Sequence, residues 1–374
     1  MVSNSQKYIT VIPNPYPGAR LGHKLKDIFT AFILAEWFNL QYLHNPIPDY
    51  GDGNDWENFL GLGEKEKLFA DVATRDVFIV SCSPLLGIRR LRSKSYFVLK
   101  SIIKLERIFR KVIYNRLDRI KFINEWSSPY WHGVPFDYIE KLFSNINDNH
   151  DEIVYCFLHS VRVTLTQVNI LGKEGRINQD IYNNVLNKLR KKYHQQQHPD
   201  KISSYNPELI NIAVPIRRED ATLEDGRFIP LKFYENIIKQ LIEVFQEQSY
   251  ELHVYSLASQ EDGQEIINSF TQKYKQVKFH INEPAMKVMH HLIISDILIV
   301  DHSSFHQISG FLSQGIKLYH PHGYIEELDD DTWIPVDYQG IFNQEDFVDA
   351  VNNLRLDHHI YKNGQTKKLP DQLN

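Results

Sequence analysis

Two adjacent arginines, Arg217 and Arg218, directly follow an apolar segment at 210–216 that predicts a strand. Open α/β sheets bind their ligands at the carboxyl ends of strands. A planar guanidinium offers paired donors that match a phosphate, so the arginines indicate a grip on a diphosphate. The alternative is an ion-pair loop in which they meet Glu219 and Asp220. Taken alone, the motif leaves both interpretations open.

A second motif joins acidic, histidine and serine residues at the end of another predicted strand. Residues 295–305 read SDILIVDHSSF, so the apolar run 297–300 is followed at once by a helix start. Ser303 and Ser304 are good N-cap residues, and the N–H groups of a helix start favour a phosphate. Simple helix capping explains the same serines equally well.

A third motif, the segment GARLGH at 18–23, separates the first predicted strand (8–13) from the first predicted helix (23–38). Glycine lets a ligand approach the backbone closely, and the helix start again suits an anion. The alternative is a plain turn between a strand and a helix.

In order and rough spacing, these motifs resemble the GDP-fucose-dependent fucosyltransferase superfamily, which includes α-1,2-, α-1,6- and protein O-fucosyltransferases. The family's arginine motif corresponds to residues 215–220, and its strand-Ser-Ser-Phe motif corresponds to 295–305. Its glycine-rich first loop corresponds to 20–23, and a fourth motif, a strand ending near Ser-Asp, to 254–257. The similarity is clearest over residues 8–45 and 208–320.

The resemblance implies an inverting, metal-independent enzyme without a cofactor that transfers fucose from GDP-fucose to a glycan hydroxyl. It implies that Arg217 contacts the β-phosphate and stabilises the charge that grows on the leaving diphosphate. Arg218 is expected to hold the loop, and Asp296 and Asp301 to lie near the guanine or ribose. The donor-binding residues that follow from the resemblance are Arg20, Gly22, His23, Arg217, Arg218, Ser256, Asp296, Asp301, Ser303, Ser304 and Phe305.

Three positions depart from the family's motifs: the family histidine is Pro215, its glycine is Glu219 and its first-loop asparagine is His23. For His23, three roles stay open, namely general base, contact with phosphate or sugar, and a helix-start residue with no role. Arg217 and His23 are the candidate catalytic residues. An inverting transfer needs a base for the acceptor hydroxyl. The carboxylates considered for that role are Asp27, Asp49, Asp52, Asp55 and Glu57.

Other functions remain open beside fucosyl transfer. One is a glycosyltransferase with another nucleotide-sugar donor, and another is a non-catalytic module that binds a nucleotide or a glycan. The aromatic loop at 126–133 suits either acceptor binding or packing. His302 and His306 are four residues apart, but without a glutamate-bearing histidine motif we expect no metal.

Alternating strands and helices predict an α/β fold, and the resemblance makes it GT-B-like, with two Rossmann-like doubly wound domains facing a cleft. We expect an acceptor-side domain at 1–195 and a nucleotide-sugar-binding domain at 205–345. A polar linker at 188–204 would join them, and 346–374 would form a C-terminal tail.

Residues 88–121 carry twelve lysines and arginines against two acids, with apolar residues at helical spacing. The segment predicts a basic helical insertion of one or two amphipathic helices. Three interpretations stay open: contact with an anionic membrane surface, a solvated face of a core helix, and contact with nucleic acid.

Composition narrows the class of protein. The net charge of −5 and the pI near 6.4 give no general indication of a nucleic-acid partner. The two cysteines, Cys82 and Cys156, do not form a disulfide framework. Because no apolar run reaches about 18 residues, we predict a cytoplasmic location, with peripheral membrane contact through 88–121.

Overall fold

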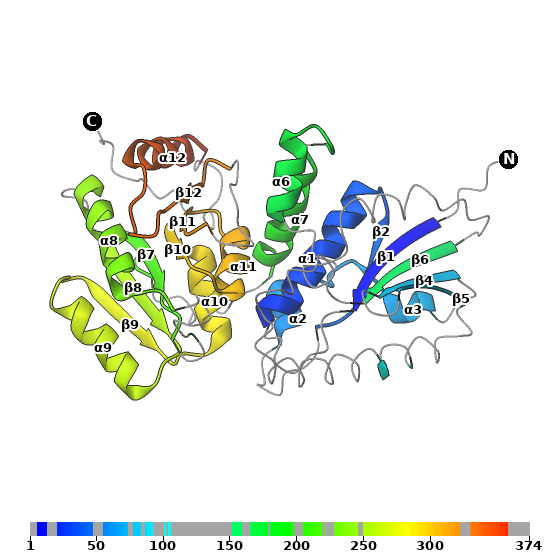
Figure 1. Cartoon of the computed structure of the whole chain (residues 1–374), viewed down its shortest axis with the longest axis horizontal. Helices are drawn as coiled ribbons and strands as arrows, with labels where there is room; N and C mark the ends of the chain where they lie inside the picture. The colour runs from blue at the N-terminus through cyan, green and yellow to red at the C-terminus, as the bar shows by residue number, and fades with distance from the viewer. Residues whose placement is uncertain are drawn as a thin grey trace. The chain divides into compact units, whose positions relative to one another are not determined.

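The chain divides into two compact units, an N-terminal unit (Met1–Gln196) and a C-terminal unit (Gln197–Asn374), which are described separately (Figure 1). Each contains a sheet with helices packed on it, so the α/β prediction is confirmed. The computed structural model describes residues 6–12, 21–47, 55–73, 78–83, 87–92, 101, 104–105, 152–158, 165–178, 180–196, 198, 205–218, 221, 228–245, 250–321 and 330–357.

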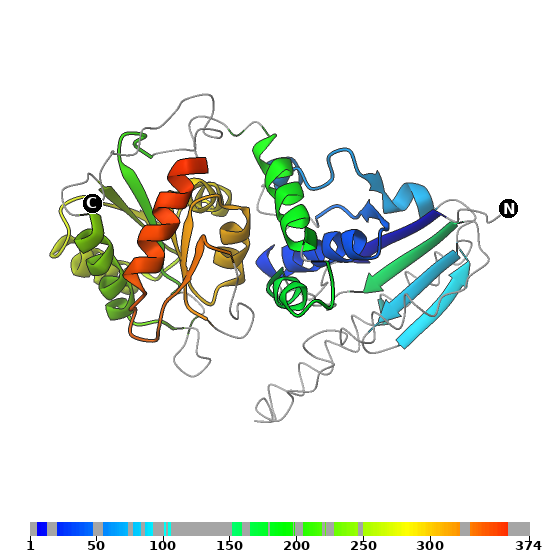
Figure 2. The same cartoon turned by 90° about the horizontal axis from the view of Figure 1, so that it is seen from above.

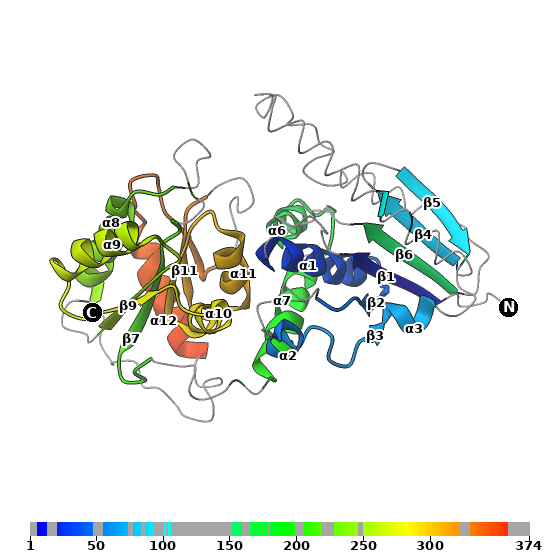
Figure 3. The same ribbon diagram turned by 90° about the horizontal axis from the view of Figure 1, so that it is seen from below.

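The N-terminal unit has a sheet of order β3-β2-β1-β6-β4-β5, in which only β5 runs antiparallel to its neighbour. Figure 3 shows β1, β6, β4 and β5 side by side. The strands are β1 (Gln6–Ile12), β2 (Gln41–His44), β3 (Lys67–Leu68), β4 (Phe78–Ser83), β5 (Gly87–Arg92) and β6 (Glu152–Leu158). The helices are α1 (Leu21–Trp37), α2 (Trp56–Leu60), α3 (Phe69–Ala73), α6 (Leu165–Lys173) and α7 (Asp180–His194).

Strand β1 lies inside this sheet with both faces covered, since four successive residues from Tyr8 to Val11 are buried. Helix α1 packs against β1 and α7. Its apolar residues recur at helical spacing, and 13 of its 17 residues are buried. Tyr8 and Leu43 belong to a core cluster that includes Phe69 and Val72 of α3.

Two predictions for this unit need correction. Residues 88–92 belong to β5, an edge strand paired with β4, and not to a basic helix. Of 93–121, only 101, 104 and 105 are described, and these are helical. The predicted linker is wrong for 188–194, which end α7. There, Leu189 and Tyr193 are fully buried, a helical spacing that the many polar neighbours obscured.

The C-terminal unit has an all-parallel sheet of order β12-β11-β10-β7-β8-β9. In chain order, the first three strands of the unit step outward to one edge of the sheet and the next three to the other edge, as in doubly wound sheets. The strands are β7 (Ile210–Pro215), β8 (Tyr250–Ser256), β9 (Val277–Ile281), β10 (Ile297–Val300), β11 (Ile316–Tyr319) and β12 (Trp333–Pro335). The helices are α8 (Leu231–Phe245), α9 (Gln260–Thr271), α10 (Ala285–Ile294), α11 (Ser304–Leu312) and α12 (Gln344–Asp357).

Burial explains why these segments form a parallel sheet. Every residue of β7, β10 and β11 is buried, as expected for strands covered on both faces. Helix α8 adds Phe233, Ile237 and Leu241 to the core, three apolar residues at helical spacing. The predicted tail is wrong for 346–357, because α12 lies along the sheet (Figure 2) and buries Phe347 completely.

Within the described part of the chain, no helix combines the length and the apolar character needed to cross a membrane.

Candidate functional site

The candidate site lies in the C-terminal unit, where the strand order reverses. Strands β7 and β10 are neighbours, with Ile212 opposite Ile297 and Ala213 opposite Leu298. Because the strands are parallel, their carboxyl ends lie on the same side of the sheet, and so do the residues that follow them. Arg217 follows β7, and Asp301 follows β10. Doubly wound sheets bind ligands at this edge, next to the reversal.

Asp301 is the fixed point of the site. Its Oδ1 accepts hydrogen bonds from the Ser303 N–H (2.8 Å) and from His306 Nδ1 (2.5 Å). Its Oδ2 accepts one from the hydroxyl of Tyr234 in α8 (3.3 Å). Burial disfavours the charged carboxylate, but His306, the Ser303 N–H and the charge of Arg217 outweigh burial and lower the pKa of Asp301. An ionised carboxylate therefore ties β10, α8 and α11 together.

His306 forms a dyad with Asp301. It is the third residue of α11, and its side chain is 11% exposed. Since Nδ1 is hydrogen-bonded to Asp301, Nε2 is the ring nitrogen that can form a hydrogen bond with a ligand. A carboxylate that fixes an imidazole in this way selects its tautomer and orients the opposite nitrogen.

The start of α11 supplies backbone donors. Ser303 is the N-cap, as predicted, but its hydroxyl makes no capping hydrogen bond, and its backbone N–H donates to Asp301 Oδ1. Ser303 is buried, whereas Ser304 and Phe305 are half-buried. The first N–H groups of a helix have no acceptor within it, and the helix dipole favours an anion there.

The two arginines have different environments. Arg218 is buried: its Nη1 donates to the carbonyl oxygens of Arg217 (2.8 Å) and Ile229 (3.2 Å), and its guanidinium lies 4.2 Å from the ring centre of Phe228. Arg217 is only partly buried. The hydroxyl of Ser256, at the end of β8, donates to the carbonyl of residue 216 (2.8 Å). Arg218 and Ser256 thus hold the backbone that carries Arg217.

Asp296 lies apart from these residues. It precedes β10, whereas Asp301 follows it, and five extended residues span roughly 16 Å. Its Oδ2 accepts from the backbone N–H (2.9 Å) and the side-chain Nδ2 (3.2 Å) of Asn211. Asp296 therefore braces the amino ends of β7 and β10, and its predicted contact with a guanine or ribose has no support.

An aromatic group next to the dyad was not predicted. The ring of His320, which follows β11, lies 4.8 Å from that of His302 and 5.5 Å from that of Phe233. Tyr338, which is 83% exposed, lies 4.6 Å from it. The sequence signal was the place of His320 directly after a strand, at the same edge as Asp301. Tyr234 carried no such signal, because its contact with Asp301 depends on how α8 packs.

The predicted first-loop residues belong to the N-terminal unit. Gly22 is buried and His23 is exposed in the first turn of α1, while Arg20 lies outside the described residues.

Among the carboxylates considered as a base, Asp27 is buried in α1, and Asp49 and Asp52 are not described. Asp55 caps α2 through the Asn58 N–H. Glu57 accepts from the Ile47 N–H and binds His44 Nε2 at 2.8 Å. Asp55 and Glu57 thus serve local structure.

Among the described residues, no three histidine, cysteine, aspartate or glutamate side chains are grouped closely enough to hold a metal ion. Cys156 is buried and forms no disulfide with a described residue. The aromatic loop 126–133 lies outside the described residues. In comparisons with known proteins, neither a family model nor a curated protein matches the chain.

Proposed function

We propose that this protein is a glycosyltransferase that uses a nucleotide sugar, with GDP-fucose as the donor and a glycan hydroxyl as the acceptor. The observation that supports the proposal is the pairing of Arg217 with the Asp301-anchored start of α11 at the reversal of the strand order. The Arg217 guanidinium and the first backbone N–H groups of α11 meet there, at the carboxyl ends of the strands, where doubly wound sheets bind ligands.

In this mechanism the site binds the diphosphate of the donor. Arg217 neutralises its charge, and the N–H groups of α11 donate hydrogen bonds to its oxygens. As the glycosidic bond breaks, negative charge grows on the leaving diphosphate. A guanidinium held in place by a fixed backbone stabilises that charge more in the transition state than in the ground state.

His306 adds a second donor in the proposed mechanism. When protonated, its Nε2–H donates to an oxygen of the leaving diphosphate, and Asp301 balances the charge of the imidazolium. His23 remains a candidate base for the acceptor hydroxyl.

The finer fold class, GT-B, and the choice of GDP over other nucleotides are part of the same proposal. A crystal structure with bound GDP would test both. The cytoplasmic location and the membrane contact of 88–121 stay predictions.

Thermal shift with nucleotides tests the site directly. At about 100 times its Kd, GDP should stabilise the protein by about 2.7 kcal/mol and raise the midpoint by roughly 5–10 °C. Arg217→Ala should fold normally and lose this shift. Arg176→Ala, which removes a partly exposed arginine of the N-terminal unit, is the matched control and should keep it. Equal shifts in the wild type and Arg217→Ala would remove Arg217 from the site.

A turnover assay separates an enzyme from a binding module. We expect slow release of GDP from GDP-fucose without an acceptor, and a loss of that release in Arg217→Ala. GDP binding without any hydrolysis or transfer would support the non-catalytic alternative. A thermal shift with another nucleoside diphosphate but none with GDP would mean that the donor carries that other nucleotide.

A further inference from the structure

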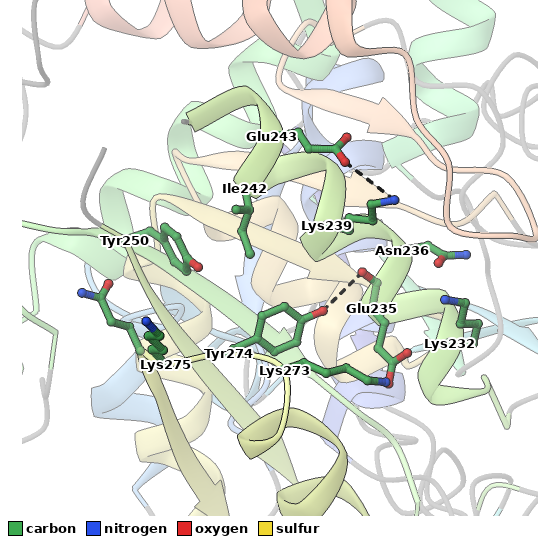
Figure 4. A pocket seen from close by; sticks show the side chains of 11 residues that line it. Lys232, Glu235, Asn236, Lys239, Ile242, Glu243, Tyr250, Lys273, Tyr274 and Lys275 are labelled. Atoms are coloured by element: carbon green, nitrogen blue, oxygen red, sulfur yellow. Dashed lines mark hydrogen bonds and ion pairs between the residues drawn. The ribbon is translucent and has the colours of Figure 1, made fainter. Parts of the chain in front are cut away.

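The C-terminal unit has a groove of about 750 Å³ outside the candidate site (Figure 4). It lies between α8 and the residues 273–276 that precede β9. Tyr250, the first residue of β8, lines it, whereas Ser256 at the other end of β8 adjoins Arg217. Seven strand residues span roughly 20 Å, so the groove is separate from the switch of strand order. Its main lining residues are Lys232, Lys239, Tyr250, Lys273, Tyr274 and Lys275.

One wall of the groove is fixed by a buried glutamate. Glu235 in α8 accepts hydrogen bonds from Lys273 Nζ and from the Ser269 hydroxyl (2.7 Å). Its backbone carbonyl accepts one from the Tyr274 hydroxyl (3.4 Å). Burial favours the neutral carboxyl, but the donors from Lys273 and Ser269 outweigh it and lower the pKa of Glu235. The ring of Tyr274 therefore stays in place beside an ionised pair.

The groove carries excess positive charge. Four lysines line it against two glutamates, and the glutamates are engaged by Lys273 and Lys239. Lys232 and Lys275 are exposed and form no hydrogen bond or ion pair with the described residues. Two ammonium groups thus remain for an anionic ligand.

The rest of the lining suits sugar rings. Tyr250 and Tyr274 are half-buried, and burial raises the pKa of both hydroxyls, that of Tyr274 to about 12. Both rings are neutral, so they combine an apolar face with a polar tip, as sugar-binding surfaces do. The groove runs from Lys232 to Glu243, which spans about 16 Å of helix and exceeds the size of a free phosphate.

We propose that this groove binds an anionic oligosaccharide, with the acidic groups at Lys232 and Lys275 and the sugar rings on the two tyrosines. The carboxylate, sulfate or phosphate of such a chain would meet the same ammonium groups. The proposal goes beyond the transferase activity, because the binding requires no turnover and no donor.

Calorimetry with defined ligands tests the groove. An oligogalacturonate and a phosphorylated malto-oligosaccharide represent the two sources of negative charge, and an unmodified malto-oligosaccharide is the neutral control. Both anionic chains should bind, and the neutral chain should bind more weakly. The double variant K232E/K275E should weaken anionic binding about tenfold, because it reverses two exposed charges. The control K65E/K191E, at exposed lysines of the N-terminal unit, should stay within about twofold.

A second variant tests the sugar contact. Tyr250→Ala should weaken the binding of the saccharides. It should leave the binding of a glutamate oligopeptide unchanged, since the peptide contacts only the lysines. Equal binding of the neutral chain, or K232E/K275E binding as well as the wild type, would overturn the proposal. A glutamate oligopeptide that binds as tightly as the saccharides would reassign the groove to acidic peptides. The GDP-induced thermal shift of each variant shows separately whether the candidate site is intact.

Discussion

Acid should destabilise the C-terminal unit through a cluster of buried histidines. His253 in β8 is fully buried, and its Nδ1 lies 3.1 Å from Nε2 of His280 in β9. Its ring is 4.4 Å from that of Tyr205. Burial, together with His280, Lys278 and His291, lowers the pKa of His253 from 6.5 to about 3. Glu251 Oε2 lies 3.1 Å from its Nε2, but burial dominates, so the fold favours the neutral imidazole.

The sign and the size of the effect follow from this pKa. Below pH 6.5 the unfolded chain binds a proton at His253 that the folded chain does not, so stability falls as the pH drops from 6.5 towards 3. At pH 5 the pH lies 1.5 units below the unfolded pKa, which corresponds to about 2 kcal/mol. For a unit of this size the midpoint should fall by roughly 4–8 °C.

Thermal or urea unfolding between pH 7 and 5 measures this loss. His253→Gln should remove the contribution of His253, so the loss of unfolding free energy between pH 7 and 5 should be smaller by about 2 kcal/mol. The variant itself will be less stable than the wild type at pH 7. His194→Gln, at an exposed histidine of α7, should leave the dependence unchanged within about 0.5 kcal/mol. The same slope in His253→Gln and the wild type would refute the reasoning.

Three further predictions concern stability and are measured by denaturant unfolding. Asp301→Asn should cost about 2–4 kcal/mol at pH 7, because it removes the charge from buried hydrogen bonds. The cost should shrink in acid, as the pH falls from 3.8, the ordinary pKa of an aspartate, through the lowered pKa of Asp301. An unchanged free energy of unfolding would contradict this role. Gly340→Ala should destabilise by more than about 2 kcal/mol, because φ is +83° and a Cβ would lie 2.2 Å from the Phe233 oxygen, whereas Gly175→Ala, with φ of +68° and open space, should cost only about 1–2 kcal/mol. Equal costs would exclude the steric contact. Phe347→Ala should cost about 3–5 kcal/mol, and a negligible cost would show that α12 adds nothing to the core.

Much of the C-terminal sheet could be predicted from the sequence. The strands at 277–281, 297–300 and 316–319 and the helix at 285–294 have the predicted bounds, because short apolar runs alternate with polar turns. In contrast, β5 could not be recognised. Its six residues include three arginines, and they run into a longer basic segment whose apolar residues at helical spacing dominated the pattern.

The site was only partly predictable for a physical reason. Arg217 and Asp301 each follow an apolar strand, which is a local signal. That these two strands are neighbours depends on the order of six strands, which no local pattern encodes. The hydrogen bond from Tyr234 to Asp301 also depends on how α8 packs, because Tyr234 belongs to α8 and Asp301 follows β10. Asp296 was grouped with Asp301 because only one short apolar run separates them in the sequence. That run is strand β10, so the two carboxylates lie at opposite ends of it, and Asp296 binds Asn211 instead.

Helix α8 contacts both proposed sites through consecutive residues. The hydroxyl of Tyr234 binds Asp301, and the carboxylate of Glu235 binds Lys273. A small rotation of this helix would therefore alter the anion site and the groove together. If a nucleotide at the first site changes the affinity of the second for a saccharide, linkage requires the saccharide to change the affinity for the nucleotide by the same factor.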